Sequence, residues 1–139
     1  MKRSFLALLA TMLLWVATIT PSYAFKQSDV DRALNYLECQ NCDLSGANLS
    51  YEDLSESNLT GANLTGANLS NAYLKYTDLS KANLTGANLT EAHVIHITLE
   101  GADLTNANLE YADLNYGDLY GAKLCNTTLA AGEVDNSGC

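Results

Sequence analysis

One aliphatic residue returns at every fifth position over most of this chain. The series runs from Leu44 to Leu129 and holds 18 repeats, of which 17 are centred on Leu and one on Val94. The residue two positions before each centre is small, and it is Ala in 11 of the 18 cases. The residue directly before the centre is Asn or Asp in 13 of the 18. So long and regular a run predicts that residues 42–131 form a single repetitive structure.

A period of five fits neither an α-helix nor a straight strand. The apolar stripe of a helix recurs at three and four residues, and strand residues five apart face opposite sides. Leu faces inward at every repeat only if the backbone bends once per pentapeptide, which makes the chain coil. Within each short extended piece, the centre and the small residue two positions earlier share a side. The pattern therefore predicts an interior of Leu and Ala, with the other three positions pointing outward.

The repeat resembles a known family. Residues 62–66 read Ala-Asn-Leu-Thr-Gly and residues 87–91 read Ala-Asn-Leu-Thr-Glu, and this pattern is similar to that of pentapeptide repeat proteins. The resemblance implies an all-β solenoid, a right-handed quadrilateral β-helix with four pentapeptides in each coil of about 20 residues. Coils stacked at the strand spacing of about 4.8 Å make about 4.5 coils and a rod roughly 20 Å long.

Two inward positions break the pattern. Glu52 occupies a small-residue position, so either the chain bulges there or the side chain escapes past the edge of the first coil. Ile97 is large for its inward position and predicts a local widening of the coil that carries His93 and His96.

Both ends differ from the repeat. Residues 1–24 have a positive start, an apolar run and small residues before Phe25, which is typical of a cleavable signal peptide. The alternative is an uncleaved anchor helix, although the run is shorter than the roughly 20 residues that a bilayer needs. Within residues 25–41 we expect a short amphipathic helix from Asp29 to about Leu37, capped by Ser28, that covers the first coil. Residues 132–139 form a C-terminal tail.

The charge is strongly acidic. The whole chain carries −9. Loss of Lys2 and Arg3 with the signal peptide leaves 5 Lys+Arg against 16 Asp+Glu, a net charge of −11. Such a surface repels nucleic acid and anionic membranes and favours a basic protein partner. The alternative role of this charge is to keep the fold from aggregating.

The four cysteines, Cys39, Cys42, Cys125 and Cys139, all lie beyond the signal peptide, and an even count in an exported chain indicates disulfides. Given the coil geometry that the resemblance implies, the two pairs lie roughly 20 Å apart. Only Cys39–Cys42 and Cys125–Cys139 are then within disulfide reach. Cys42 holds an inward small-residue position, so a buried thiol and a redox-active Cys-x-x-Cys remain alternatives for the first pair.

No catalytic constellation is apparent, and we expect no enzymatic activity and no cofactor. Ser and Thr are mostly repeat residues at outward positions. His93 and His96 lack a clear third ligand for a metal ion. A metal carrier is therefore a weak alternative to two surface histidines.

Stacking every 20 residues concentrates the unusual outward side chains on one face, around Leu54, Leu74, Val94 and Leu114, although Tyr51, Tyr111 and Tyr120 fall outside it. The expected partner-binding residues there are Tyr73, Tyr76, His93, Ile95, His96 and Tyr116. Exposed aromatic residues are enriched in binding surfaces. They also stabilise neighbouring strands by cross-strand stacking, and the two interpretations stay open.

The leading functional interpretation is a rigid, exported protein-interaction or scaffold module with an unknown protein partner. We expect no contact with nucleic acid or, after cleavage, with membrane, and a monomer or weak dimer. The resemblance to short exported members in cyanobacteria implies the periplasm or the thylakoid lumen. It also supplies an alternative, since some family members resemble duplex DNA in shape and charge and bind nucleic-acid-processing proteins. The signal sequence, the short rod and the uniform Leu centres favour the first interpretation.

Overall fold

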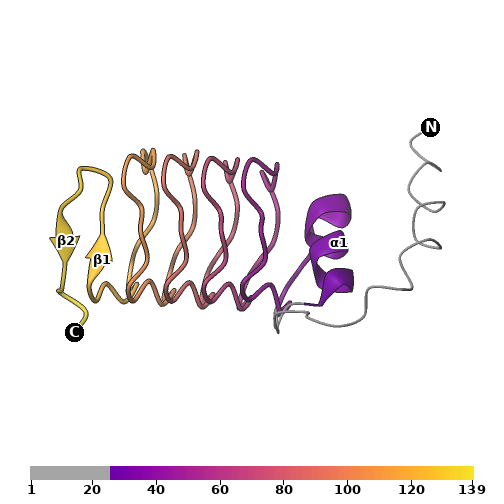
Figure 1. Cartoon of the computed structure of the whole chain (residues 1–139), viewed down its shortest axis with the longest axis horizontal. Helices are drawn as coiled ribbons and strands as arrows, with labels where there is room; N and C mark the ends of the chain where they lie inside the picture. Colours follow the sequence, from indigo (N-terminus) through magenta and orange to yellow (C-terminus); the bar gives the residue numbers. More distant parts are fainter. Residues whose placement is uncertain (1–25) are drawn as a thin grey trace, which may run out of the picture.

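The computed structural model describes residues 26–139. The predicted signal peptide, residues 1–24, lies outside this range. Figure 1 shows a row of coils with a helix, α1, at the N-terminal end and a small hairpin, β1–β2, at the C-terminal end.

The coils are joined by parallel bridges between residues 20 positions apart. Asn63 bridges Asn83, and Asn83 bridges Asp103. Each contact uses the same two hydrogen bonds: the Leu44 N–H donates to the Asn63 carbonyl at 2.8 Å, and the Asn63 N–H donates to the Cys42 carbonyl at 2.9 Å. One turn of the solenoid therefore contains four pentapeptides, and every face is a narrow parallel sheet.

Each pentapeptide ends in a tight turn that makes the corner. The Ala47 N–H donates to the Leu44 carbonyl at 3.0 Å, and the third residue of the turn, Gly46, has φ 69°. A positive φ at this position defines a type II turn. Because the turn recurs every five residues, Leu returns to the inner side of each successive face.

The interior is the one that the pattern predicts. Leu64, Leu84 and Leu104 are fully buried and follow one another in successive coils, because the residues before them are bridged. The small residues two positions before each centre fill the space between the Leu stacks, as Ala62 and Ala82 do. Close packing of this kind leaves no room for larger side chains at most of these positions.

The Asn or Asp before each centre has a structural task that the outward assignment did not predict. The Asn63 Oδ1 accepts hydrogen bonds from the amide and the hydroxyl of Thr65, at 3.2 and 2.7 Å. Its Nδ2 donates to the Asp43 Oδ1 of the preceding coil at 3.2 Å. The side chain thus fixes the start of its own corner and connects two coils.

Helix α1 spans Gln27–Tyr36 and begins earlier than predicted. The N-cap is Lys26, without a side-chain cap bond, so the assignment of Ser28 as the cap is wrong. The reason is tertiary: the Lys26 N–H donates to the Asp43 carbonyl at 3.2 Å, and the Asp29 carboxylate accepts the Asp43 N–H at 2.9 Å. These bonds attach the first turn to the first coil, while Val30 on the inner side is buried.

At the other end, β1 (Thr127–Thr128) pairs antiparallel with β2 (Val134–Asp135). The tail therefore folds back on the last repeats rather than continuing the coil. The Gly138 N–H donates to the Leu124 carbonyl at 2.7 Å, which extends this attachment along the final coil.

The two irregular positions are accommodated locally. The Glu52 side chain is exposed, and its carbonyl accepts the Tyr73 N–H at 2.9 Å, so the chain passes through without a bulge. Ile97 is buried, and its Cγ2 would lie 3.3 Å from a Cβ on Gly117 in the next coil, so the absence of a side chain there provides space. Over residues 38–128 the series of bridges has one gap, between His93 and Asp113, in the coils where we predicted widening.

Candidate functional site

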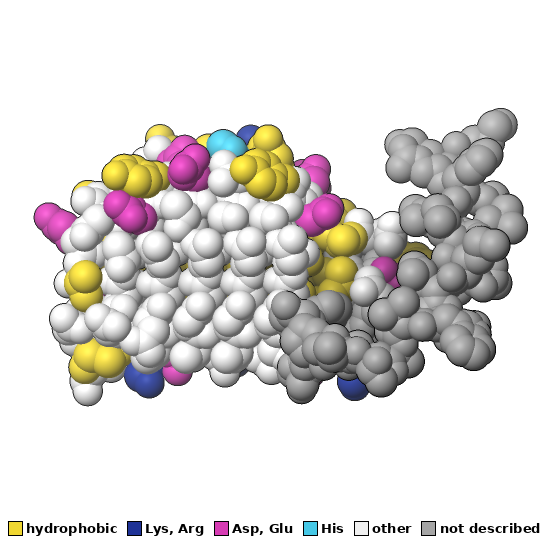
Figure 2. All heavy atoms as spheres, viewed as in Figure 1, with side chains coloured by type: hydrophobic (Ala, Val, Ile, Leu, Met, Phe, Trp, Pro, Cys, Tyr) yellow, Lys and Arg dark blue, Asp and Glu magenta, His cyan; other side chains and the backbone are white. Residues whose placement is uncertain are grey.

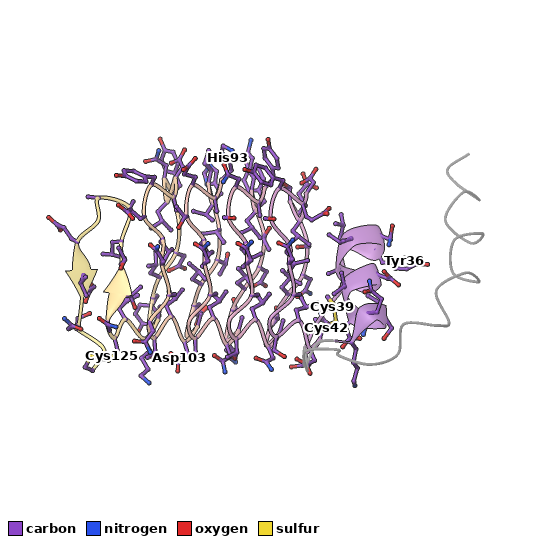
Figure 3. All side chains as sticks on the ribbon, viewed as in Figure 1. Tyr36, Cys39, Cys42, His93, Asp103 and Cys125 are labelled. Atoms are coloured by element: carbon purple, nitrogen blue, oxygen red, sulfur yellow. A yellow bond between two sulfur atoms is a disulfide. The ribbon has the colours of Figure 1, made fainter. Side chains whose placement is uncertain are left out.

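The six predicted binding residues lie on the face built around Leu54, Leu74, Val94 and Leu114. Bridges join Asp53 to Tyr73 and Tyr73 to His93, which places equivalent positions of the coils above one another. We call the set of six the aromatic wall: Tyr73, Tyr76, His93, Ile95, His96 and Tyr116. Figure 3 places His93 at one long edge of the molecule and Asp103 and Cys125 at the opposite edge.

The rings of the aromatic wall form two stacked columns. His96 lies between Tyr76 and Tyr116, with ring centroids 4.9 and 4.8 Å apart and interplanar angles of 12° and 14°. Tyr73 stacks on His93 at 4.8 Å and 13°. Because the rings repeat at the coil spacing, the backbone ladder itself sets the stacking distance.

The longer column occupies left-handed corners. Tyr76, His96 and Tyr116 have φ of 60°, 56° and 60°. This conformation costs a residue with a side chain roughly 1–2 kcal/mol, whereas an aromatic pair returns about 0.5–1.5 kcal/mol beyond its burial. Lys81 and Glu91 occupy the same kind of corner, so the backbone alone does not distinguish the wall. The alignment of three rings on successive coils does.

The shorter column, Tyr73 and His93, occupies the position directly before the centre. There it lacks the hydrogen bond that an Asn or Asp side chain accepts from the amide two residues later. In the first and last coils of this face, Asp53 and Asp113 accept the amides of Ser55 and Asn115, at 3.1 and 3.2 Å. Tyr73 and His93 occupy the equivalent positions and have no carboxylate or amide oxygen to do so. The wall therefore lacks two local bonds, each worth about 1 kcal/mol.

Accessible rings and charges surround the columns. The exposed fractions are 52% for Tyr76 and 81% for Tyr116. The Lys75 Nζ lies 5.2 Å from the centroid of the Tyr76 ring, so this surface already holds one cation against an aromatic face. In Figure 2, hydrophobic, His and acidic side chains gather along the same edge. This edge presents flat rings among carboxylates.

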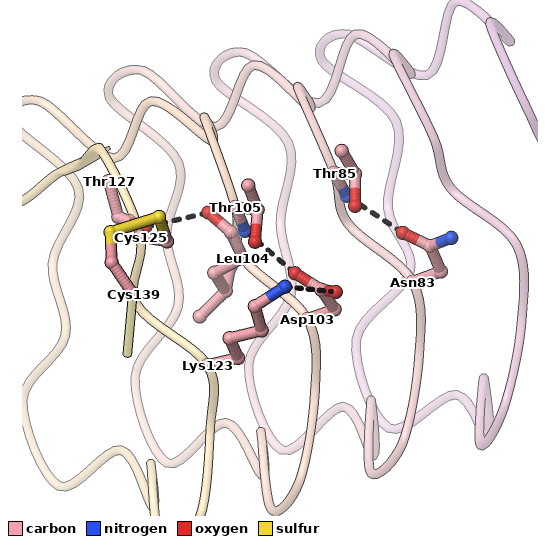
Figure 4. A network of polar contacts seen from close by, with 9 residues as sticks. All are labelled: Asn83, Thr85, Asp103, Leu104, Thr105, Lys123, Cys125, Thr127 and Cys139. Carbon is pink, nitrogen blue, oxygen red and sulfur yellow. Dashed lines mark hydrogen bonds and ion pairs between the residues drawn. A yellow bond between two sulfur atoms is a disulfide. The ribbon is translucent and has the colours of Figure 1, made fainter. Parts of the chain in front are cut away.

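The opposite face is smooth and polar. Its corners include Gly46, Gly66 and Gly86, and Figure 4 shows its network of hydrogen bonds. There the Asp103 Oδ1 accepts the Thr105 N–H at 3.0 Å, and the Lys123 Nζ of the next coil lies 3.5 Å from the Asp103 Oδ2. The face opposite the wall is therefore polar, while the exposed rings of the coils lie on the wall and, for Tyr51, Tyr111 and Tyr120, on the faces beside it.

Both disulfides are formed. Cys39 is bonded to Cys42, beside α1, and Cys125 is bonded to Cys139 in the tail. Cys39 and Cys42 are buried, and the Cys39 Sγ lies 3.1 Å from the Asp29 carbonyl of α1. The two bonds therefore fasten the two ends of the solenoid, and no free thiol remains among residues 26–139.

Residues 26–139 contain no cluster of three His, Cys, Asp or Glu side chains arranged to hold a metal ion. None of the helices described is long and apolar enough to span a bilayer.

Comparison with protein families gives one match. A model described as pentapeptide repeats, with 8 copies, matches residues 38–75, 67–106 and 95–129. No match was found among curated proteins.

Comparison with solved structures gives similar chains of the same description. A pentapeptide repeat protein from the thylakoid lumen of Arabidopsis thaliana is 32% identical, with a TM-score of 0.43, and the match covers 63% of this chain and 64% of that one. A pentapeptide repeat protein from Nostoc PCC 7120 is 34% identical, with a TM-score of 0.42, and the match covers 69% and 72%. The present chain thus spans slightly less than two thirds of the Arabidopsis protein.

Proposed function

Because this chain belongs to the pentapeptide repeat family, whose members fold as right-handed quadrilateral β-helices, we propose that it is an exported, non-enzymatic protein-binding module. Its binding surface is the aromatic wall. We assign residues 1–24 to a signal peptide, 25–41 to a capping helix and connection, 42–131 to a β-helix of about 4.5 coils, and 132–139 to the tail.

The stacked column Tyr76–His96–Tyr116 is the observation that carries this proposal. The left-handed corner alone does not distinguish this column, because Lys81 and Glu91 occupy the same conformation. What distinguishes it is the alignment of three rings on successive coils, of which Tyr76 and Tyr116 stay 52% and 81% exposed despite stacking. A partner that buries these rings gains the apolar area that stacking leaves exposed.

The partner is a protein with a basic contact surface. The chain carries −9, and Glu56 and Asp113 lie at the two ends of the wall, so cationic side chains find both carboxylates and ring faces. The ladder of backbone hydrogen bonds holds the rings in place before binding, which lowers the entropy cost of association.

Export rests on two features that agree. The N-terminal pattern is typical of a signal peptide, and two disulfides suit an oxidising compartment. We place the mature protein in the periplasm or the thylakoid lumen, as a monomer or weak dimer that binds neither nucleic acid nor membrane.

A protein that mimics DNA is the second candidate, and the acidic charge favours it. A mimic needs carboxylates in regular rows, as phosphates are in a duplex. The column before the centres on the polar face instead reads Asp43, Asn63, Asn83, Asp103 and Lys123. Neutral and basic side chains thus interrupt the row of carboxylates. This favours protein binding through the aromatic wall over mimicry of DNA.

The test is affinity capture from the exported compartment with a wall variant, in which Tyr76, His96 and Tyr116 are all replaced by Asn. Asn tolerates the left-handed corner, so the fold is retained, which circular dichroism checks. The matched control replaces Tyr51 and Tyr111 by Asn. Both are exposed at left-handed corners of the neighbouring face. We expect a specific partner with the natural protein and the control, and its loss with the wall variant. Equal recovery of the same proteins by all three would refute the proposal.

A further inference from the structure

The last coil leaves two of its four sides without a backbone partner. In the first two coils of the wall face both the centre and the corner residue donate to the next coil, as Leu74 does to the His93 carbonyl at 2.9 Å and Tyr76 does to the Ile95 carbonyl at 3.2 Å. In the third coil, the one with the gap in the bridges, the corner residue His96 still donates to the Asn115 carbonyl at 3.0 Å. Within residues 26–139, no backbone acceptor is present for the equivalent amides of the last coil. These donors are Leu114, Tyr116, Leu119 and Gly121.

Two carbonyls of the same strands are also unused. Those of Ala92 and Ile97 accept the amides of Asp113 and Asp118, at 3.1 and 2.9 Å. One coil further, the carbonyls of Ala112 and Gly117 accept no backbone amide from the part of the chain that the structure describes. The tail covers the other two sides, where the Gly138 N–H reaches the Leu124 carbonyl. An edge of ten residues, 112–121, therefore presents the complete hydrogen-bonding pattern of a parallel ladder.

The side chains along this edge are those of an unfinished interior. Leu114 and Leu119 are only partly buried, while the Leu centres of the preceding coils are fully buried. Tyr116 ends its column, so one face of its ring has no stacking neighbour among the described residues. An added strand with a Leu centre would bury both leucines further.

The charge of the edge determines what can pair with it. Asp113 and Asp118 occupy the position before the two centres. On the polar face opposite the wall, Asp103 holds the equivalent position, and the Nζ of Lys123, one coil later, lies 3.5 Å from its carboxylate. The chain itself therefore shows that a basic residue on the next strand pairs with an Asp at this position. A second copy of this edge would instead bring carboxylates together.

We propose that the edge formed by residues 112–121 binds an extended, basic segment of another protein, which adds as the next parallel strand. Backbone groups of the segment complete the ladder. Its apolar residues cover Leu114 and Leu119, and its Arg or Lys side chains pair with Asp113 and Asp118. This site lies at the end of the solenoid, and only Tyr116 is shared with the aromatic wall.

A synthetic peptide tests the proposal with the full chain. The probe repeats Ala-Arg-Leu-Thr-Gly twice, so that Arg falls before each centre. We expect NMR shifts and slowed hydrogen exchange at the amides of Leu114, Tyr116, Leu119 and Gly121. A peptide with Asp in place of Arg, and one methylated at the backbone nitrogens that face the edge, should not bind.

Variants of the protein complete the test. Asp113→Asn with Asp118→Asn keeps the oxygens that accept the amides of Asn115 and Tyr120 and should weaken binding by about tenfold. Asp31→Asn, an exposed acid on α1, is the matched control and should have no effect. Tyr73→Asn should also leave peptide affinity unchanged, which separates this site from the proposed function. No binding, binding mapped to the wall, or a dimer that closes the edge would overturn the proposal.

Discussion

The imidazole of His96 stacks on the ring of Tyr116 with centroids 4.8 Å apart, and both residues lie in the left-handed region of the backbone. The distance is the spacing between neighbouring strands. The backbone ladder therefore places outward side chains 20 residues apart above one another, close enough for many of them to make contact. What a column of side chains does then depends on their chemistry: rings stack, amides exchange hydrogen bonds and opposite charges pair.

The first prediction concerns this pair. A double-mutant cycle with His96→Gly and Tyr116→Gly should give a coupling energy of about 0.5–1.5 kcal/mol in chemical unfolding. Gly keeps the corner conformation accessible and adds no side chain, whereas two Asn residues at such corners bond to each other, as Asn126 does to Asn106 at 2.7 Å. The same cycle with Tyr51 and Tyr116, which lie on different faces, should give a coupling near zero. A vanishing coupling for His96 and Tyr116 would show that the rings stack without stabilising the fold.

The second prediction separates backbone strain from packing. A Cβ added at Gly66 would have no heavy atom within 4 Å, but the residue has φ 64°. Gly66→Ala should therefore lower the free energy of unfolding by about 1 kcal/mol, through conformation alone. Gly66→Asn is the control and should cost less, because Asn tolerates this region. Equal losses for the two variants, measured by urea unfolding, would contradict this account.

The third prediction concerns the irregular coil. Gly117 does not have a positive φ, but a Cβ there would meet the Leu114 carbonyl at 3.2 Å and the Ile97 Cγ2 at 3.3 Å. Gly117→Ala should destabilise the protein by crowding, on the order of 1–3 kcal/mol. In an Ile97→Ala background, where space is available, the same substitution should cost less. Additive losses in the double variant would mean that Ile97 is not the residue that crowds position 117. Thermal unfolding of the natural protein, the two single variants and the double variant decides between these outcomes.

The period of five predicted that the chain coils with Leu and the small residues inward, because these residues share a side. The 20-residue coil, and with it the alignment of the wall residues, followed only from the resemblance to pentapeptide repeat proteins. The role of Asn63 was not predictable in the same way. Its partners are Thr65 and Asp43, and Asp43 lies 20 positions away in the sequence. The repeat pattern shows only that the Asn63 side chain points outward, and it does not show which residues that side chain contacts.

The start of α1 was missed for a related reason. Local capping rules pointed to Ser28, whereas Lys26 and Asp29 are fixed by hydrogen bonds to Asp43 on the first coil. A tertiary contact thus overrode the local signal. The open edge was also hidden, because the sequence does not show that the tail turns back over only two sides of the last coil.

The fourth prediction concerns acid. The hydroxyl and amide of Ser45 both donate to the Asp43 carboxylate and hold its pKa below the ordinary value of 3.8. Burial acts to raise the pKa of Asp78, but the hydrogen bonds from Ser80 outweigh it, and that pKa is lowered too. A lowered pKa in the folded protein means that these carboxylates contribute stability above about pH 4, and that this contribution is lost as the pH falls through the folded values.

Urea unfolding at a series of pH values tests this prediction. Stability should fall as the pH drops below about 4, and Ser45→Ala should reduce the size of that fall, because the folded pKa of Asp43 then returns toward its ordinary value. Ser28→Ala, an exposed position in α1, is the control and should leave the pH dependence unchanged. The account of Asp43 is wrong if both variants have the same pH dependence.

The last prediction concerns the tail. The Cys125–Cys139 bond spans 14 residues, whereas Cys39–Cys42 spans 3. A loop of about 15 residues loses roughly 3 kcal/mol of conformational entropy when it is closed. Much of residues 131–139 is exposed, and apart from two pairs in β1–β2 only a few hydrogen bonds attach them. Replacing Cys125 and Cys139 by Ser should therefore release the tail locally, because the coils keep their own ladders. Hydrogen exchange should rise at residues 129–138 and stay unchanged at Leu64, Leu84 and Leu104. Faster exchange at those leucines would mean that the tail stabilises the whole solenoid, and unchanged exchange at residues 129–138 would mean that the hairpin holds without the bond.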